Sequence, residues 1–210
     1  MPWRELANDY SIVNTLEKKA PNGYGLGSET AKTVTNWDDA KENGFYKGPA
    51  PRGIGSGTII GVTFSNGPLY KVQIVYPDTR ANCSAQREMP ANGTWDTWEW
   101  VNPPMELGVE YRTTERYLGY PVYVKLINLG SLPNAGSTKQ ISVRDFGIRV
   151  PISMDLTWGN FASENFTVND YAPYVASAGF DNANINIVGG PSADTEHYEV
   201  YAFLKYSKSN

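Results

Sequence analysis

The side chains best suited to ligand chemistry gather between residues 158 and 184, where aromatic rings alternate with Asp and Asn. Saccharides present apolar C–H faces and many hydroxyls, so a site for them combines exposed rings with a few polar side chains. We therefore predict a glycan-binding segment here, although most of its rings also suit the core of a β-sandwich. The candidate ligand-binding residues are Trp158, Asn160, Asp170, Tyr171, Tyr174, Asp181 and Asn182.

The sequence contains only weak indications of a catalytic site. His197 is the only histidine, it opens an expected strand, and no Gly-x-Ser-x-Gly motif accompanies it. A glycosidase needs two carboxylates on either side of the scissile bond. Asp38 and Asp39 are adjacent, but the positive end of a short helix accounts for them. The remaining candidates for a carboxylate pair are Asp155, Glu164, Asp170 and Asp181. We predict that the chain is not an enzyme.

No metal or cofactor is predicted either. The Asp and Asn residues after position 169 lack the regular spacing of a calcium loop, and such residues commonly form turns. The Gly-rich run 53–57 lacks the Lys of a phosphate-binding loop. Cys83 is the single cysteine, which excludes an intrachain disulfide and a cysteine-based zinc site.

Composition narrows the class of protein. The 210 residues include 20 Gly, 14 Pro and 14 Tyr, while only 19% are charged, a balance that favours β structure punctuated by turns. The net charge is −4 and the basic residues are scattered, which argues against nucleic-acid binding. No apolar run is long enough for membrane insertion, and no cleaved export signal is recognised at Met1.

Patterning predicts β elements in both halves of the chain. Residues 2–19 have the spacing of a short amphipathic helix, and a second short helix is expected from Thr35 to the stop signal Gly44. The sequence from 159 to 184 is expected to be a long loop. Strands are expected at 58–64, 70–76, 85–88, 94–101, 120–129, 148–158, 184–188 and 197–207.

Three segments occur in an order that resembles a known family. They run from Thr35 to Tyr46 with Gly-Phe-Tyr at the end, from Leu69 to Pro77 with Tyr-Pro at the end, and from Gly93 to Trp100 with Gly-Thr-Trp-x-x-Trp. This order resembles the small knob domain of phage tail fibres and of pyocin-type tail fibres. The segment 113–125, followed by Leu132-Pro133-Asn134, is similar to the C-terminal part of many tail fibre proteins, although Tyr120 stands where Lys is common.

The resemblance implies an all-β tail fibre or receptor-binding protein in three parts. These are an N-terminal helical segment and linker (1–28), a knob-like domain (29–104) and a β-sandwich or jelly-roll-like head (105–210). It further implies a homotrimer at the tail tip of a virion, in contact with other tail or baseplate proteins and with a host cell-surface polysaccharide. Multivalent, non-catalytic attachment is the expected mechanism. A purely structural tail or baseplate component and a tail-borne polysaccharide hydrolase are the alternatives.

Overall fold

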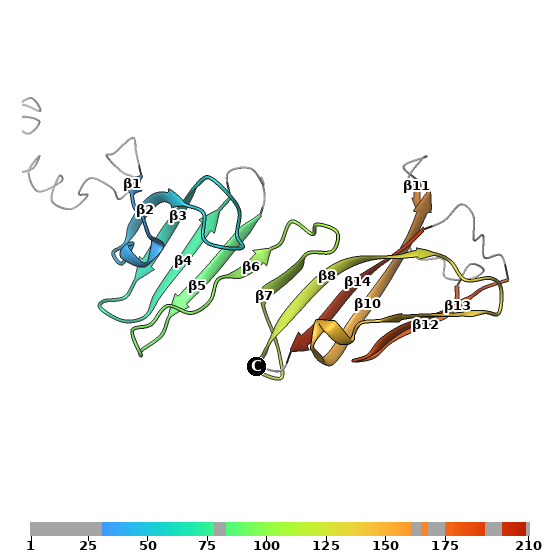
Figure 1. Cartoon of the computed structure of the whole chain (residues 1–210). Helices are drawn as coiled ribbons and strands as arrows, with labels where there is room; N and C mark the ends of the chain where they lie inside the picture. The colour runs from blue at the N-terminus through green and yellow to red at the C-terminus, as the bar shows by residue number, and fades with distance from the viewer. Residues whose placement is uncertain (1–30, 78–82, 161–164, 168–174, 192–198, 209–210) are drawn as a thin grey trace, which may run out of the picture. The chain divides into compact units, whose positions relative to one another are not determined.

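The computed structural model describes residues 31–77, 83–160, 165–167, 175–191 and 199–208 (Figure 1). Nearly all of the regular structure in these ranges is β, which confirms the all-β prediction. The chain divides into two compact units, residues 1–102 and residues 103–210. The expected helix at 2–19 lies outside the described residues.

The first unit is an up-and-down sheet in which each strand pairs with the next along the chain. Its first strand pairs in parallel with the second, and the pairs from the second strand to the sixth are antiparallel. The predicted strands at 58–64, 70–76 and 85–88 are confirmed to within a residue or two. The strands are β1 (Lys32–Thr33), β2 (Gly44–Pro49), β3 (Thr58–Ser65), β4 (Lys71–Tyr76), β5 (Ser84–Met89) and β6 (Glu99–Asn102).

The second expected helix is only one 3₁₀ turn, η1 (Trp37–Asp39), capped by the Asn36 side chain, which accepts a hydrogen bond from Asp38 N at 3.0 Å. The prediction that it extends to Gly44 is wrong, because the turn ends at Ala40 and Gly44 opens β2. The carbonyls of Trp37 and Ala40 accept hydrogen bonds from the Gln73 side chain, at 2.8 and 2.9 Å. Side chains of the sheet therefore satisfy carbonyls that a longer helix would have paired internally.

Gly61 in β3 allows η1 to lie directly on the sheet. A Cβ atom at this position would come within 2.9 Å of the Trp37 ring and within 2.5 Å of the Ile74 carbonyl oxygen. Trp37 is 3% exposed, and its indole Nε1 donates to Pro49 O at 2.8 Å. The absence of a side chain at Gly61 is thus what makes room for the buried ring.

The second unit consists of two sheets that share one hydrophobic core (Figure 1). The larger sheet contains, in order, β7 (Glu110–Tyr117), β8 (Tyr120–Ser131), β14 (Glu199–Lys208), β10 (Ile148–Asn160) and β11 (Asn165–Thr167). The smaller sheet contains β12 (Val175–Phe180), β13 (Asn184–Gly189) and β9 (Thr138–Ser142). A 3₁₀ turn, η2 (Arg144–Phe146), follows β9. Buried side chains of both sheets, such as Leu204 and Ile187, form the core.

The sequence located four strands of this unit correctly, namely those found as β8, β10, β13 and β14. β10 contains a register shift between Pro151 and Ser153, at a proline that cannot donate to the ladder. The expectation of one long loop from 159 to 184 is wrong, because β11 and β12 lie within it. β12 contains small residues of low strand propensity, and its pairing with β13 forms it.

Candidate functional site

Arg87 is the centre of a buried cluster in the first unit. Its side chain is 8% exposed, although an arginine is rarely buried without partners. Its guanidinium lies 2.7 Å from a carboxylate oxygen of Asp38, and its Nε donates to Gln73 Oε1 at 2.8 Å. Burial lowers the pKa of Arg87, whereas the hydrogen bond and the charge of Asp38 raise it. The ion pair therefore compensates the cost of burying the cation.

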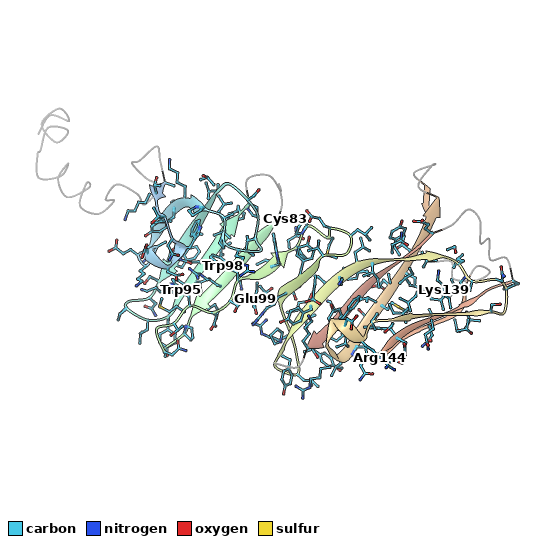
Figure 2. The ribbon with its side chains drawn as sticks, in the orientation of Figure 1. Cys83, Trp95, Trp98, Glu99, Lys139 and Arg144 are labelled. Atoms are coloured by element: carbon cyan, nitrogen blue, oxygen red, sulfur yellow. The ribbon has the colours of Figure 1, made fainter. Side chains whose placement is uncertain are left out.

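Two tryptophan rings complete this cluster (Figure 2). The Arg87 guanidinium carbon lies 4.5 Å from the Trp95 ring centroid and 4.6 Å from that of Trp98. Trp98 also meets Trp37 edge to face, with centroids 6.3 Å apart. The prediction of a strand at 94–101 is wrong for its first half, because β6 begins only at Glu99. Both rings stack on Arg87, so the cluster is a packing centre rather than an open binding site.

A polar network on the larger sheet of the second unit is a better candidate for binding. Asn128 in β8 pairs in register with Tyr201 in β14, on the sheet face opposite core residues such as Ala202. Asn128 Nδ2 donates to Glu199 Oε2 at 2.9 Å, and Tyr201 OH donates to the same oxygen at 2.5 Å. Asn128 Oδ1 accepts from Gly130 N at 2.6 Å, which fixes the amide. Two donors thus orient an exposed carboxylate of Glu199.

The network shifts the ionisation of both of its titratable groups. Hydrogen bonds from Tyr201 and Asn128 hold the pKa of Glu199 below its usual value, so this group is an anion at neutral pH. Burial raises the pKa of Tyr201 to about 12, with a further contribution from Glu199. The site therefore offers a fixed acceptor with a neutral phenol beside it, which suits hydrogen bonding to hydroxyl groups.

The raised pKa of Tyr201 predicts a loss of stability in alkali. The unfolded tyrosine loses its proton near its ordinary pKa of 10.0, whereas the folded one keeps it until about pH 12. Unfolding is therefore favoured increasingly as pH rises through this window, by at most about 1.4 kcal/mol per pH unit. Urea unfolding of the wild type and of Tyr201→Phe at pH 9 and pH 11 measures this contribution. We expect a smaller decrease in the variant, and equal decreases would contradict the assignment.

A groove of about 270 Å³ separates the edges of β10 and β12 in the second unit. Part of its lining is apolar, and Gly179 has open space where a side chain would lie. Asp181 and Asn182 follow directly in the turn after β12. The groove is lined by Pro151, Ile152, Ser153, Met154, Ala178, Gly179 and Phe180.

The structure describes four of the seven candidate ligand-binding residues. Asp181 and Asn182 are exposed in the turn between β12 and β13, and Asp181 Oδ1 accepts from Ala183 N and Asn184 N, both at 2.7 Å. These bonds lower the pKa of Asp181 and give it a turn-forming role. Trp158 and Asn160 lie in the backbone of β10, opposite Thr167 and Asn165 of β11. Asp170, Tyr171 and Tyr174, with Glu164 and His197, lie outside the described residues.

Sequence reasoning missed Asn128, Glu199 and Tyr201. Asn128 is one of few polar residues in a mainly apolar strand, and this was the available signal. The other two residues lie about seventy positions away, so only strand pairing brings them to Asn128. Among the described residues, no group of three or more His, Cys, Asp or Glu side chains could hold a metal ion. Within the same ranges, no helix is long and apolar enough to cross a membrane.

Comparisons with known proteins give distant structural similarities. No family model matches the sequence, and no curated protein matches it. A C-terminal part of the R1 pyocin fibre of P. aeruginosa aligns over 85% of this chain and 68% of its own, with 9% identity and a TM-score of 0.28. An N-truncated R2-type pyocin tail fibre aligns over 84% of this chain and 98% of its own, with 7% identity and a TM-score of 0.28. At these values the similarities assign neither a family nor a function.

Proposed function

We propose that this chain is a phage tail fibre or receptor-binding protein that attaches a virion to a host cell-surface glycan without catalysis. The protein is a homotrimer at the tail tip, in contact with other tail or baseplate proteins. An N-terminal segment (1–28) leads into a knob-like domain (29–104) and a head (105–210). Several weak glycan sites in one particle gain affinity by binding together.

The proposal is carried by the packing of the first unit, in which the three segments of the knob-like sequence pattern contact one another. Trp37 and Asp38 come from its first segment, Gln73 from its second, and Trp95 and Trp98 from its third. Arg87 is contacted by the side chains of Asp38, Gln73, Trp95 and Trp98, and the Trp98 ring contacts the Trp37 ring. Residues separated by up to sixty positions therefore form one packing centre. This supports a resemblance based on a folded unit rather than on chance matches.

The network of Asn128, Glu199 and Tyr201 supports a hydroxyl-rich ligand. Its carboxylate is exposed and oriented by two donors. The strand pairing places Gly159 of β10 opposite Glu199, next to the candidates Trp158 and Asn160. A sugar that binds here has an anionic acceptor for its hydroxyls, and each charge-assisted hydrogen bond contributes about 1.5–3 kcal/mol.

The test is binding of the full chain to polysaccharides isolated from the surfaces of a panel of bacteria, measured by biolayer interferometry. We expect at least one polysaccharide to bind, and Glu199→Gln and Asn128→Ala to weaken binding by about tenfold or more. Glu115→Gln is the matched control, since Glu115 is an exposed carboxylate whose ion pair with Lys205 lies elsewhere in the unit.

Each contrary result points to a different class of protein. If the chain binds no polysaccharide and does not attach to intact cells, glycan attachment is wrong and a structural tail component replaces it. If reducing ends accumulate in the polysaccharide mixtures, the chain is a hydrolase. If the control variant weakens polysaccharide binding equally, the glycan site does not centre on Glu199.

A further inference from the structure

The sheet of the first unit has an apolar face that no described segment covers. The register aligns Phe45 of β2, Val62 of β3 and Ile74 of β4 in one row across the sheet. A second row contains Ile60 and Tyr76, and a third contains Phe64 and Val72. The exposed fractions are 50% for Phe45, 59% for Ile60, 55% for Phe64 and 48% for Tyr76, while Val62, Val72 and Ile74 are partly buried. We call these seven residues the outer apolar face.

The covered face of this sheet is mixed in polarity, because it buries apolar residues such as Ile59, Val75 and Met89 together with several polar ones. Its covered face buries polar side chains, namely Thr63, Gln73, Arg87 and Lys71. Three of these bind the covering turn and the cluster beneath it: Thr63 Oγ1 donates to Ala40 O at 2.9 Å, and Gln73 binds both η1 and Arg87. Antiparallel sheets normally place the apolar residues toward the core and the polar residues toward water. Here the uncovered face carries large apolar side chains as well.

We propose that the outer apolar face is the surface on which a second copy of this chain packs. Half-exposed side chains of this size present roughly 400 Å² of apolar surface, in the range of the largest patches found on monomers, which are often functional. Each partner of a stable interface contributes about 800 Å², of which the fully buried core is the more apolar part. The face therefore has the size of an interface core that a polar rim completes.

Charges at the borders of the face fit a copy of the same chain. Lys47 continues the row of Ile60 and Tyr76 on β2, and Glu88 continues the row of Phe64 and Val72 on β5. One side of the face therefore carries a basic residue and the opposite side an acidic one. When copies pack around a common axis, the β2 border of one lies near the β5 border of the next, so that opposite charges meet.

This inference deepens the proposed function, because it locates on one face the self-association that a fibre requires. It rests on that proposal only for the number of copies. The face and its polarity come from the contacts of the first unit.

The experiment is the mass of the full chain in solution, measured by light scattering over a hundredfold range of concentration. The test variant is Ile60→Lys with Phe64→Lys, and the control is Leu118→Lys, since Leu118 is 79% exposed in the turn between β7 and β8. A milder variant, Ile60→Thr with Phe64→Thr, keeps β-branched side chains in β3. Circular dichroism and thermal unfolding establish that every variant is folded.

We expect the wild type and the control to form the same oligomer, and the Lys variant to have its dissociation constant raised at least a hundredfold. The Thr variant should lie between them. A wild type that is monomeric at all concentrations overturns the inference and implies that another part of the same chain covers the face. An oligomer that persists unchanged in both folded variants also overturns it. Polysaccharide binding by a monomeric variant would separate this result from the proposed function.

Discussion

Replacing Arg87 with Met is expected to lower the free energy of unfolding of the first unit by about 2–4 kcal/mol, the combined cost of an unsatisfied buried acceptor and of the lost cation–π contacts. Methionine fills much of the space between Trp95 and Trp98, but it makes no ion pair with Asp38 and leaves Gln73 Oε1 without its buried donor. An unsatisfied buried polar group alone costs about 1–3 kcal/mol. Urea unfolding followed by tryptophan fluorescence measures the change, because the rings of Trp37, Trp95 and Trp98 report on this cluster.

Arg149→Met is the matched control for this substitution. The Arg149 guanidinium also lies over an aromatic ring, 3.9 Å from the centroid of Tyr120, but its side chain is exposed. An exposed cation–π contact contributes about 0.5–1 kcal/mol, so the control should cost no more than that. If the two variants lose equal stability, Arg87 is not the packing centre of the unit. Asp38→Asn should be milder than Arg87→Met, because the Asp38 side chain is 53% exposed.

Tyr206→Ala is expected to destabilise the second unit by about 3–5 kcal/mol. Tyr206 is fully buried and stacks between Tyr123 and Phe146, with ring centroids 6.3 and 6.4 Å away. Its hydroxyl donates to Glu110, which also pairs with Lys208 Nζ at 2.5 Å. Removing the ring leaves a cavity at the junction of β8, β14 and η2, and this cavity adds to the lost burial.

Tyr206→Phe separates the hydroxyl from the ring. This variant keeps both stacked contacts and loses only the hydrogen bond to Glu110, so we expect a smaller cost of about 1.5–3 kcal/mol. Tyr117→Ala is the control, since Tyr117 is 39% exposed in the hairpin of β7 and β8, and its cost should stay below about 1 kcal/mol. Chemical unfolding monitored by far-ultraviolet circular dichroism compares the three. An Ala variant no worse than the Phe variant would show that the ring packs loosely.

The sequence predicted the strands whose own patterns are strong. Ile148 to Trp158 alternates over eleven residues, and β10 occupies this segment. Segments without an intrinsic pattern were missed. β12 consists mainly of small residues, and its edge position beside β13 is what makes it a strand. The helix expected after Thr35 is only one turn long, because Gln73 and Thr63 donate hydrogen bonds to carbonyls that a longer helix would pair internally.

The tertiary structure decided which face of β4 is buried. β4 alternates, with Val72 and Ile74 on one side and Lys71, Gln73 and Val75 on the other, but period-2 patterning does not state which side is covered. The covering turn supplies both the buried Trp37 ring and carbonyls that accept hydrogen bonds from Gln73, so the side of the strand with Gln73 and Val75 became the inside. The outer apolar face is the consequence of that choice.

The residues of the candidate site also differ in whether the sequence or only the tertiary structure identified them. By composition the sequence determined the all-β class and the polar, aromatic stretch that holds Trp158 and Asn160. Only the tertiary structure decided that Asn128, Glu199 and Tyr201 form a network and that Asp181 forms a turn. Local sequence patterns reflect the secondary structure that a residue and its neighbours in the chain prefer. Contacts between strands seventy residues apart depend on register and on burial, which a linear pattern does not encode.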